Sequence, residues 1–315
     1  MGPGSKWGRR AIGALLGACA LALPAAAGAE PPHYLTATDS VFSGTTIAIK
    51  GDAEPEILGR VVFKGTIPIP GPNQVVTVNV EREGREPFSR RVMTDPVSGR
   101  FEMPLKLHGC CHYWVQAQHG ADVSDPLAFD VSGPKTLEAG PQALLFNRLL
   151  DKAGYHMGDE ITDQVDESTG LGIMALRKTM DLTRTEEYAP SLFTMLLRGR
   201  GRFEPVHDED GRHVEVDISR QVMALVEDGK VSDVFHVSTG SGGTPRGEWS
   251  FYSKSPGYNA KGMYYSLYYD GNYATHGFAS VPTYPASHGC VRIPRYLENS
   301  FFYRNPVGRP VFVHD

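Results

Sequence analysis

The sequence predicts a multidomain, mainly β protein with a small helical segment between two β-rich parts. Up to about residue 131, short runs of β-branched and aromatic residues alternate with turns that contain Pro, Gly and Asp. Between about residues 140 and 200 the apolar residues recur at helical spacing, and after residue 212 the β pattern returns. A chain of 315 residues is long enough for two or three units, each with its own core.

Residues 1–29 have the pattern of a signal peptide. Lys6, Arg9 and Arg10 precede an apolar run from Ala11 to Leu23, and a cleavage site follows at Ala27-Gly28-Ala29. The sequence therefore predicts an exported protein. A lipoprotein box that ends at Cys19 is the alternative. The apolar run is shorter than the roughly 18 residues of a membrane span and no later run is longer, so we expect no transmembrane segment after cleavage.

The charge of the mature chain narrows the choice of partners. Removing residues 1–29 deletes three basic residues and no acidic one, so the formal net charge changes from −5 to −8. Nucleic acids and anionic membranes bind patches of Lys and Arg. An acidic surface therefore argues against both kinds of partner.

Residues 34–132 are predicted to form an antiparallel β-sandwich. The runs 45–49, 59–63, 74–80 and 113–117 are rich in strand-forming residues, and the turns 68–72 and 95–99 lie between them. Several short strands at this spacing over about a hundred residues are typical of two packed sheets.

Adjacent cysteines, Cys110 and Cys111, lie in this unit. A bridge between them would close a strained small ring, and the sequence leaves a vicinal disulfide and two free thiols equally open. The flanking His108 and His112 suggest a metal site as an alternative. Neighbouring strand residues point to opposite faces, which fits a single tetrahedral site poorly, so no metal is expected.

Residues 140–200 are predicted to form a small domain of three helices. Residues 132–135 are the expected linker before it. Leu145, Leu149 and Leu150 mark the first helix, Leu171, Met174, Ala175 and Leu176 the second, and Leu192, Phe193, Leu196 and Leu197 the third.

Residues 212–315 are predicted to form a second β-rich domain. The alternating runs 214–218 and 221–226 are expected strands, and the turn 227–230 leads to a return strand over 231–237. The pattern indicates hairpins built around one core.

The chemistry of this domain centres on Cys290. A cysteine attacks as the thiolate, and a neighbouring imidazole such as His276 or His288 can remove the thiol proton. Gly289 lets the backbone before the cysteine approach a substrate closely, with N–H groups aimed at an oxyanion. One cysteine, two histidines and glycines in one Pro-rich stretch therefore indicate nucleophilic catalysis at Cys290.

These residues resemble the signature of the YkuD-type L,D-transpeptidases, which cross-link bacterial peptidoglycan. The matching motifs are His276-Gly277 and Ser287-His288-Gly289-Cys290-Val291-Arg292, with ten residues between His276 and Ser287. Upstream, Val237-Ser238-Thr239-Gly240 and Thr244-Pro245-Arg246-Gly247 resemble two further family motifs. The resemblance covers about residues 212–315.

The resemblance implies a role for each motif residue. Cys290 would attack the third residue of a tetrapeptide stem, release D-alanine and pass the acyl group to an amine as a 3–3 cross-link. His276 would be the general base, oriented by the carbonyl of Gly277, and the amides of Gly289 and Cys290 would hold the oxyanion. His288 and Ser287 would shape and support the turn. No metal or organic cofactor is implied, and acylation of Cys290 by carbapenems is expected.

Three further residues are predicted to bind substrate. Arg292 could pair with a substrate carboxylate as a two-pronged donor, although a structural arginine is an equal alternative. Tyr264 and Tyr273 belong to a tyrosine-rich segment, residues 258–273, which we expect to form a wall or lid of the cleft.

The resemblance extends to the other parts of the chain. Residues 34–132 are similar to the immunoglobulin-like modules that precede many L,D-transpeptidase domains, and residues 140–200 resemble a small peptidoglycan-binding domain, for which wall binding and plain packing are both open. The expected location is the periplasm or the cell wall. An L,D-carboxypeptidase that trims stems and a non-catalytic wall-binding protein are the alternative functions.

Overall fold

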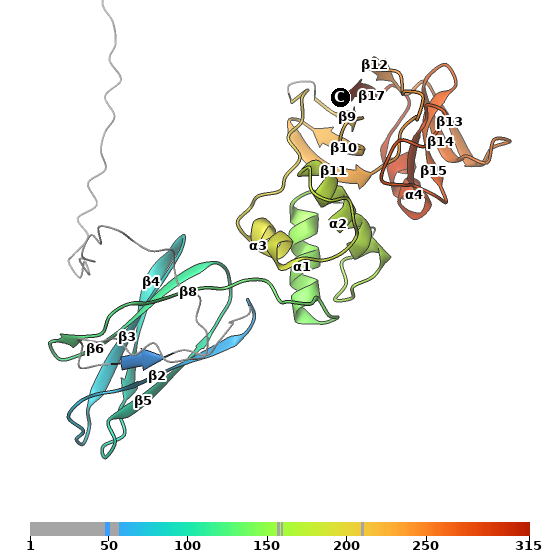
Figure 1. Ribbon diagram of the computed structural model, residues 1–315. Helices are drawn as coiled ribbons and strands as arrows, with labels where there is room; N and C mark the ends of the chain where they lie inside the picture. Colours follow the sequence, from blue (N-terminus) through green and yellow to red (C-terminus); the bar gives the residue numbers. More distant parts are fainter. Residues whose placement is uncertain (1–47, 51–56, 156–157, 159, 209–210) are drawn as a thin grey trace, which may run out of the picture. The chain divides into compact units, whose positions relative to one another are not determined.

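The computed structural model describes residues 48–50, 57–155, 158, 160–208 and 211–315 (Figure 1). The predicted signal peptide and the lipoprotein box at Cys19 lie outside these residues. Within the described ranges, no helix is long and apolar enough to cross a membrane.

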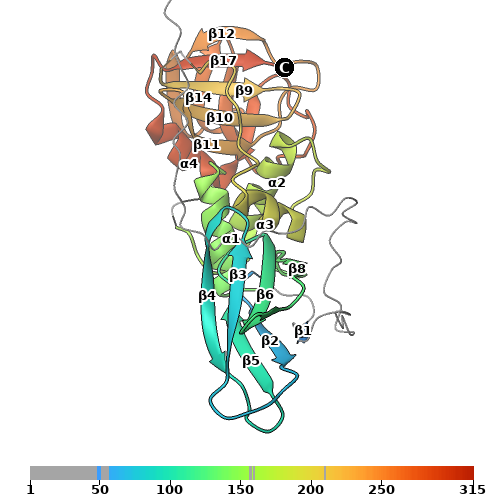
Figure 2. The ribbon, with the colours of Figure 1, turned by 90° about the vertical axis from the view of Figure 1, so that its left-hand side faces the viewer.

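Two antiparallel sheets make up the first β-rich part (Figure 2). One contains β1 (Ala48–Lys50), β2 (Arg60–Thr66) and β5 (Arg100–Lys106), in the order β1-β2-β5. The other contains β4 (Arg85–Met93), β3 (Val75–Arg82), β6 (His112–His119) and β7 (Asp122–Val123) in that order, and β8 (Leu127–Asp130) pairs with β6. The ring centroids of Phe63 in β2 and Phe129 in β8 are 5.8 Å apart, so the two sheets meet face to face.

The strands predicted at 59–63, 74–80 and 113–117 correspond to β2, β3 and β6. Val76, Val78 and Val80 of β3 are buried and the residues between them are half-buried, because successive strand residues point to opposite faces. The sequence analysis did not identify β4. Most of its residues are exposed, so the strand shows no apolar alternation.

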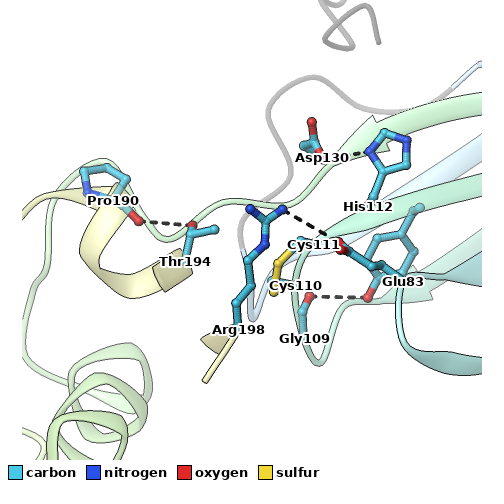
Figure 3. Close-up of a disulfide and its surroundings, with 10 residues drawn as sticks. Glu83, Gly109, Cys110, Cys111, His112, Asp130, Pro190, Thr194 and Arg198 are labelled. Carbon is cyan, nitrogen blue, oxygen red and sulfur yellow. Dashed lines mark hydrogen bonds and ion pairs between the residues drawn. A yellow bond between two sulfur atoms is a disulfide. The ribbon is translucent and has the colours of Figure 1, made fainter. Parts of the chain in front are cut away.

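Cys110 and Cys111 are joined by a disulfide, which decides the choice that the sequence left open (Figure 3). Their thiolates are therefore not free to hold a metal. Of the two flanking histidines, His112 is bonded through Nδ1 to Asp130, at 2.8 Å.

Three helices follow, at the places where the sequence predicts them. They are α1 (Pro141–Lys152), α2 (Glu167–Thr179) and α3 (Pro190–Leu197). Pro141 begins α1, where its missing N–H costs nothing, and the carboxylate of Asp166 accepts from the amides of Ser168 and Thr169 at the start of α2.

The helical segment shares its core with the second β-rich part. Tyr155, Ile173 and Leu176 belong to the same buried cluster as Val222 and Val234, which lie on two strands of the following sheet. Tyr155 also forms a parallel bridge with Val234. The predicted bounds, 140–200, remain a prediction, but the segment packs directly on the sheet.

The second β-rich part contains two sheets. In the first, the strand order is β11 (Lys230–His236), β10 (Val222–Glu227), β9 (His213–Asp217), β17 (Pro310–His314) and β12 (Gly247–Ser250). In the second, β13 (Ser253–Tyr258), β14 (Tyr264–Asp270), β15 (Tyr273–Phe278) and β16 (Val291–Pro294) follow in that order. The predicted hairpin is confirmed: Asp228 and Gly229 both have positive φ in the two-residue turn between β10 and β11.

Helix α4 (Arg295–Arg304) follows β16 and was not foreseen from the sequence. Phe301 of α4 is fully buried, with its ring 5.5 Å from Phe235 and 6.2 Å from Phe251 between centroids. The helix therefore contributes to the core of the two sheets.

We expect Phe301→Ala to lower the free energy of unfolding by about 3–5 kcal/mol, because it leaves a cavity in this core. Urea denaturation followed by tryptophan fluorescence measures the change. Tyr303→Ala, on the same helix and 67% exposed, is the control and should cost less than about 1 kcal/mol. Equal losses in the two variants would contradict this account of the core.

Candidate functional site

The parallel pairing of β15 and β16 brings the predicted nucleophile and base together. Thr275 is opposite Val291 and His276 is opposite Arg292 in this ladder. Cys290 comes directly before β16, so its backbone enters the sheet beside the strand that carries His276. The loop between the two strands contains the Pro-rich spacer and the Ser-His-Gly-Cys motif.

The upstream Ser-Thr-Gly motif packs against the Ser-His-Gly-Cys turn from the other side. Ser238 and Arg292 exchange backbone hydrogen bonds of 3.0 and 2.9 Å, and Gly240 bridges to Ser287. A Cβ on Gly240 would lie 2.5 Å from the Cα of Gly289, so only glycine permits this approach. The hydroxyl of Thr244, from the second upstream motif, donates to the carbonyl of Gly289 at 2.9 Å.

Ser287 closes the turn that presents Cys290. Its hydroxyl donates to the carbonyl of Cys290 at 2.6 Å and accepts from the amide of Gly289 at 3.0 Å. Gly289 has a φ of +129°, a conformation that a residue with a side chain rarely adopts. A Cβ there would also lie 2.2 Å from the ring of Tyr273.

A cavity of about 500 Å³ opens over this turn. Among the predicted site residues, it is lined by His276, Ser287, His288, Cys290, Arg292 and Tyr273. Gly277 and Gly289 contribute through their carbonyl groups, which accept hydrogen bonds from His276 and Thr244. Cys290 and His276 therefore face one space that is open to a substrate.

His276 is held as a neutral imidazole with a defined tautomer. Its Nδ1 lies 3.0 Å from the carbonyl of Gly277, which can only accept, so Nδ1 carries the proton and Nε2 has a free lone pair. Burial lowers the pKa of His276 below 6.5, and the nearby Arg292 lowers it further against the Gly277 hydrogen bond. At neutral pH, Nε2 can therefore accept a proton.

The Cys290 side chain is half-buried and not part of a disulfide. Burial raises the pKa of its thiol above 9.0, although a hydrogen bond from the amide of Ala274 and the charges of Lys261 and Arg292 act in the opposite direction. At neutral pH the pair is therefore a thiol and a neutral imidazole.

Arg292 and His288 occupy different parts of the cavity lining. The guanidinium of Arg292 lies over the ring of Phe278, with its Cζ 4.3 Å from the centroid, and stays half-buried. His288 is exposed beside Cys290.

The structure places the two predicted tyrosines differently. Tyr273 lines the cavity and packs on Gly289. Tyr264 lies outside the lining: its ring contacts Tyr258 and Tyr265, at 4.8 and 4.6 Å between centroids, and its backbone is opposite Gly277. The predicted contact of Tyr264 with substrate stays a prediction.

Four lining residues were not singled out from the sequence: Lys261, Met263, Asn272 and Phe278. Three of them belong to the tyrosine-rich segment, which forms one wall of the cavity. Asn259 shapes this wall, because its side-chain oxygen accepts from the amides of Lys261 and Met263, both at 3.0 Å. In the sequence, the run Asn259-Ala260-Lys261-Gly262 indicates a turn. Only the fold shows that this turn contributes to the cavity that contains Cys290.

Comparisons with known proteins agree on one family. Residues 211–313 match the family model of YkuD, the L,D-transpeptidase catalytic domain. Residues 123–326 of the L,D-transpeptidase from Xylanimonas cellulosilytica are 30% identical with a TM-score of 0.53, and the match covers 57% of this chain and 97% of that one. An L,D-transpeptidase from Stackebrandtia nassauensis is 20% identical with a TM-score of 0.36, covering 58% and 98%. The LD transpeptidase LdtMt1 in complex with imipenem is 13% identical with a TM-score of 0.30, covering 86% and 99%. A search of curated proteins gave no match.

We expect Gly289→Ala to disrupt the turn that presents Cys290, because the added methyl group meets Tyr273 at a φ that disfavours a side chain. The variant should be at least about 1–3 kcal/mol less stable, and iodoacetamide should alkylate its Cys290 at a changed rate. Thermal unfolding and peptide mass mapping measure the two effects. Gly242→Ala is the control, since nothing lies within 4 Å of its added Cβ. A Gly289→Ala protein with wild-type stability and reactivity would contradict this role.

Proposed function

The chain belongs to the YkuD L,D-transpeptidase family, and on that premise we propose that it forms 3–3 cross-links between peptidoglycan stem peptides through a cysteine thioester. One observation carries the proposal: Cys290 and His276 line the same cavity, and the Gly277 carbonyl holds His276 with Nε2 free to accept a proton. No step in this chemistry requires a metal or an organic cofactor.

The first step is acylation of Cys290. Nε2 of His276 takes the thiol proton while sulfur attacks the carbonyl carbon of the third stem residue, which is the donor. The tetrahedral intermediate then collapses, the bond to the terminal D-alanine breaks, and His276 returns the proton to the amine that leaves. The products are a thioester on Cys290 and free D-alanine.

The oxyanion of this intermediate needs N–H donors at the turn. The amide of Gly289 already donates to the hydroxyl of Ser287, so we assign the oxyanion to the amide of Cys290 rather than to both. Ser287 acts by holding the turn, and His288 shapes its exposed side. Arg292, anchored over Phe278, is proposed to attract a substrate carboxylate.

The second step transfers the acyl group to an amine of a neighbouring stem. The amine attacks the thioester carbonyl and loses a proton to His276, and the C–S bond then breaks, so that Cys290 leaves as a thiolate and takes that proton from His276. The new amide bond joins two third residues. If water attacks instead, the product is a shortened tripeptide and the protein is an L,D-carboxypeptidase.

The proposal extends to the remaining parts of the chain. We propose cleavage of residues 1–29, action in the periplasm or cell wall, an immunoglobulin-like spacer over residues 34–132, and glycan contact by residues 140–200. Carbapenems, which acylate nucleophiles through a strained ring, are proposed to acylate Cys290.

The direct test is mass spectrometry of the mature protein incubated with a disaccharide-tetrapeptide. We expect a dimer that lacks one D-alanine, and none with Cys290→Ala. A tripeptide alone would favour the carboxypeptidase. No turnover by the wild-type protein, with no mass increase at Cys290 when a carbapenem is added, would favour a non-catalytic wall-binding protein.

The pH dependence tests the role of His276. Because the neutral imidazole is the active form and burial lowers its pKa, kcat/KM should be maintained as the pH falls to 6.5 and should decrease only below it. Initial rates of D-alanine release between pH 4.5 and 9 measure the profile. An acid limb with a midpoint above 6.5 would contradict the assignment. His276→Gln should lose about 10²–10⁴-fold in kcat, the usual contribution of a general base.

A further inference from the structure

The loop that joins His276 to Ser287 is held by side chains from outside it. Nε2 of His236 donates to the carbonyl of Val281 at 2.8 Å, and Nη1 of Arg184 donates to the carbonyl of Thr283 at 2.7 Å. The hydroxyl of Ser238 donates to the carbonyl of Tyr284 at 2.7 Å. Three carbonyls of one short loop are thus fixed, and one of the donors, Arg184, belongs to the helical segment.

Lys178, near the end of α2, orients His236. Because the Val281 carbonyl only accepts, Nε2 of His236 carries the proton and Nδ1 presents its lone pair. Nζ of Lys178 lies 2.7 Å from this Nδ1 and also donates to the carbonyls of Gln221 and Val237, at 3.0 and 2.8 Å. Nζ of Lys178 therefore has three polar partners within hydrogen-bond distance.

This lysine is completely buried. Burial lowers the pKa of Lys178 and the charge of Arg184 lowers it further, so an amine at this place depends on the partners around it. Burial also lowers the pKa of His236, to about 3, which keeps its ring neutral with a single N–H directed at the loop. The three contacts of Nζ indicate that the Lys178 side chain has a defined structural role in this buried position.

Arg184 makes a second link of the same kind. Its Nη1 donates to Thr283 in the loop and its Nη2 donates to the carbonyl of Ser219, at 2.8 Å, in the turn between β9 and β10. One guanidinium therefore ties the loop to the sheet that supports it. The helical segment is also joined to the edge of the sheet by the hydrogen bond from the Val234 amide to the Gly154 carbonyl.

We propose that Lys178 and Arg184 are positioning residues of the active site: they hold the loop between His276 and Ser287 so that base and nucleophile keep their relative placement. Neither residue lines the cavity that contains Cys290, so they act through His236, Val281 and Thr283 and not on the substrate. The helical segment is then part of the catalytic machinery, whether or not it binds glycan. The kinetic part of this inference rests on the proposed function.

The main test uses Arg184→Met in the full mature chain, because the half-buried Arg184 can be replaced without opening the core. Loss of the loop restraint should lower kcat for D-alanine release by up to about 10²-fold, with KM changed less than about twofold. Arg184→Lys keeps one donor and should recover part of kcat. Arg90→Met is the matched control, since Arg90 also donates to a carbonyl, that of Pro104, but in the first β-rich part. This variant should leave kcat and KM unchanged.

Two further readouts do not depend on the reaction. Hydrogen exchange of the amides of Ala286 and Ser287, which donate to the Thr239 carbonyl, should become faster in Arg184→Met, and alkylation of Cys290 by iodoacetamide should change in rate. Lys178→Met, of similar length, should show the same two changes if it folds. A wild-type protein that is inactive on stem peptides would defeat the proposed function, while these readouts would still decide the inference.

Wild-type kcat, exchange and alkylation in a folded Arg184→Met protein would overturn the proposal. A purely structural role would appear as a lower melting temperature with unchanged kcat, and a substrate contact as a raised KM with unchanged kcat. Both results would also count against it.

Discussion

The parallel pairing of β15 and β16 is the constraint on which the candidate site depends. Parallel strands usually need a crossover of a dozen or more residues, most often with a helix, to connect them. Here the connection from Ala279 to Cys290 contains no helix, and it also carries the proposed nucleophile. Ser287 closes the end of this loop from within, and the carbonyls and amides before it are held from outside by Ser238, Thr239, His236 and Arg184.

Electrostatics follow from the burial that this pairing creates. Burial disfavours the His276 cation and lowers its pKa, and it disfavours the Cys290 thiolate and raises the pKa of the thiol. Both shifts disfavour a thiolate–imidazolium ion pair. In the proposed mechanism, this arrangement favours transfer of the thiol proton during the attack over a thiolate formed in advance. It also explains why the Gly277 carbonyl matters, because that single contact decides which ring nitrogen is available.

Gly240 and Gly289 pack directly against each other in the candidate site. Gly240 and Gly289 come from motifs that are far apart in the sequence, yet a Cβ on either would collide with the site's own atoms. The close approach allows Thr244 to reach the Gly289 carbonyl and Ser287 to close the turn around the Gly289 amide. The upstream motifs and the Ser-His-Gly-Cys motif therefore pack together into one turn region.

The sequence by itself determined the features that depend on neighbouring residues. Alternation at Val76, Val78 and Val80 predicts β3, the leucine spacing predicts α1–α3, and the Ser-His-Gly-Cys run identifies Cys290 as the nucleophile to test. Tertiary structure decided what depends on distant residues. It shows that Lys261 and Met263 line the cavity with Cys290 while Tyr264 lies outside the lining, that β4 forms although most of its residues are exposed, and that Lys178 is buried against His236. The physical reason is that hydrogen bonds and burial between segments distant in the sequence leave no periodic pattern in either segment.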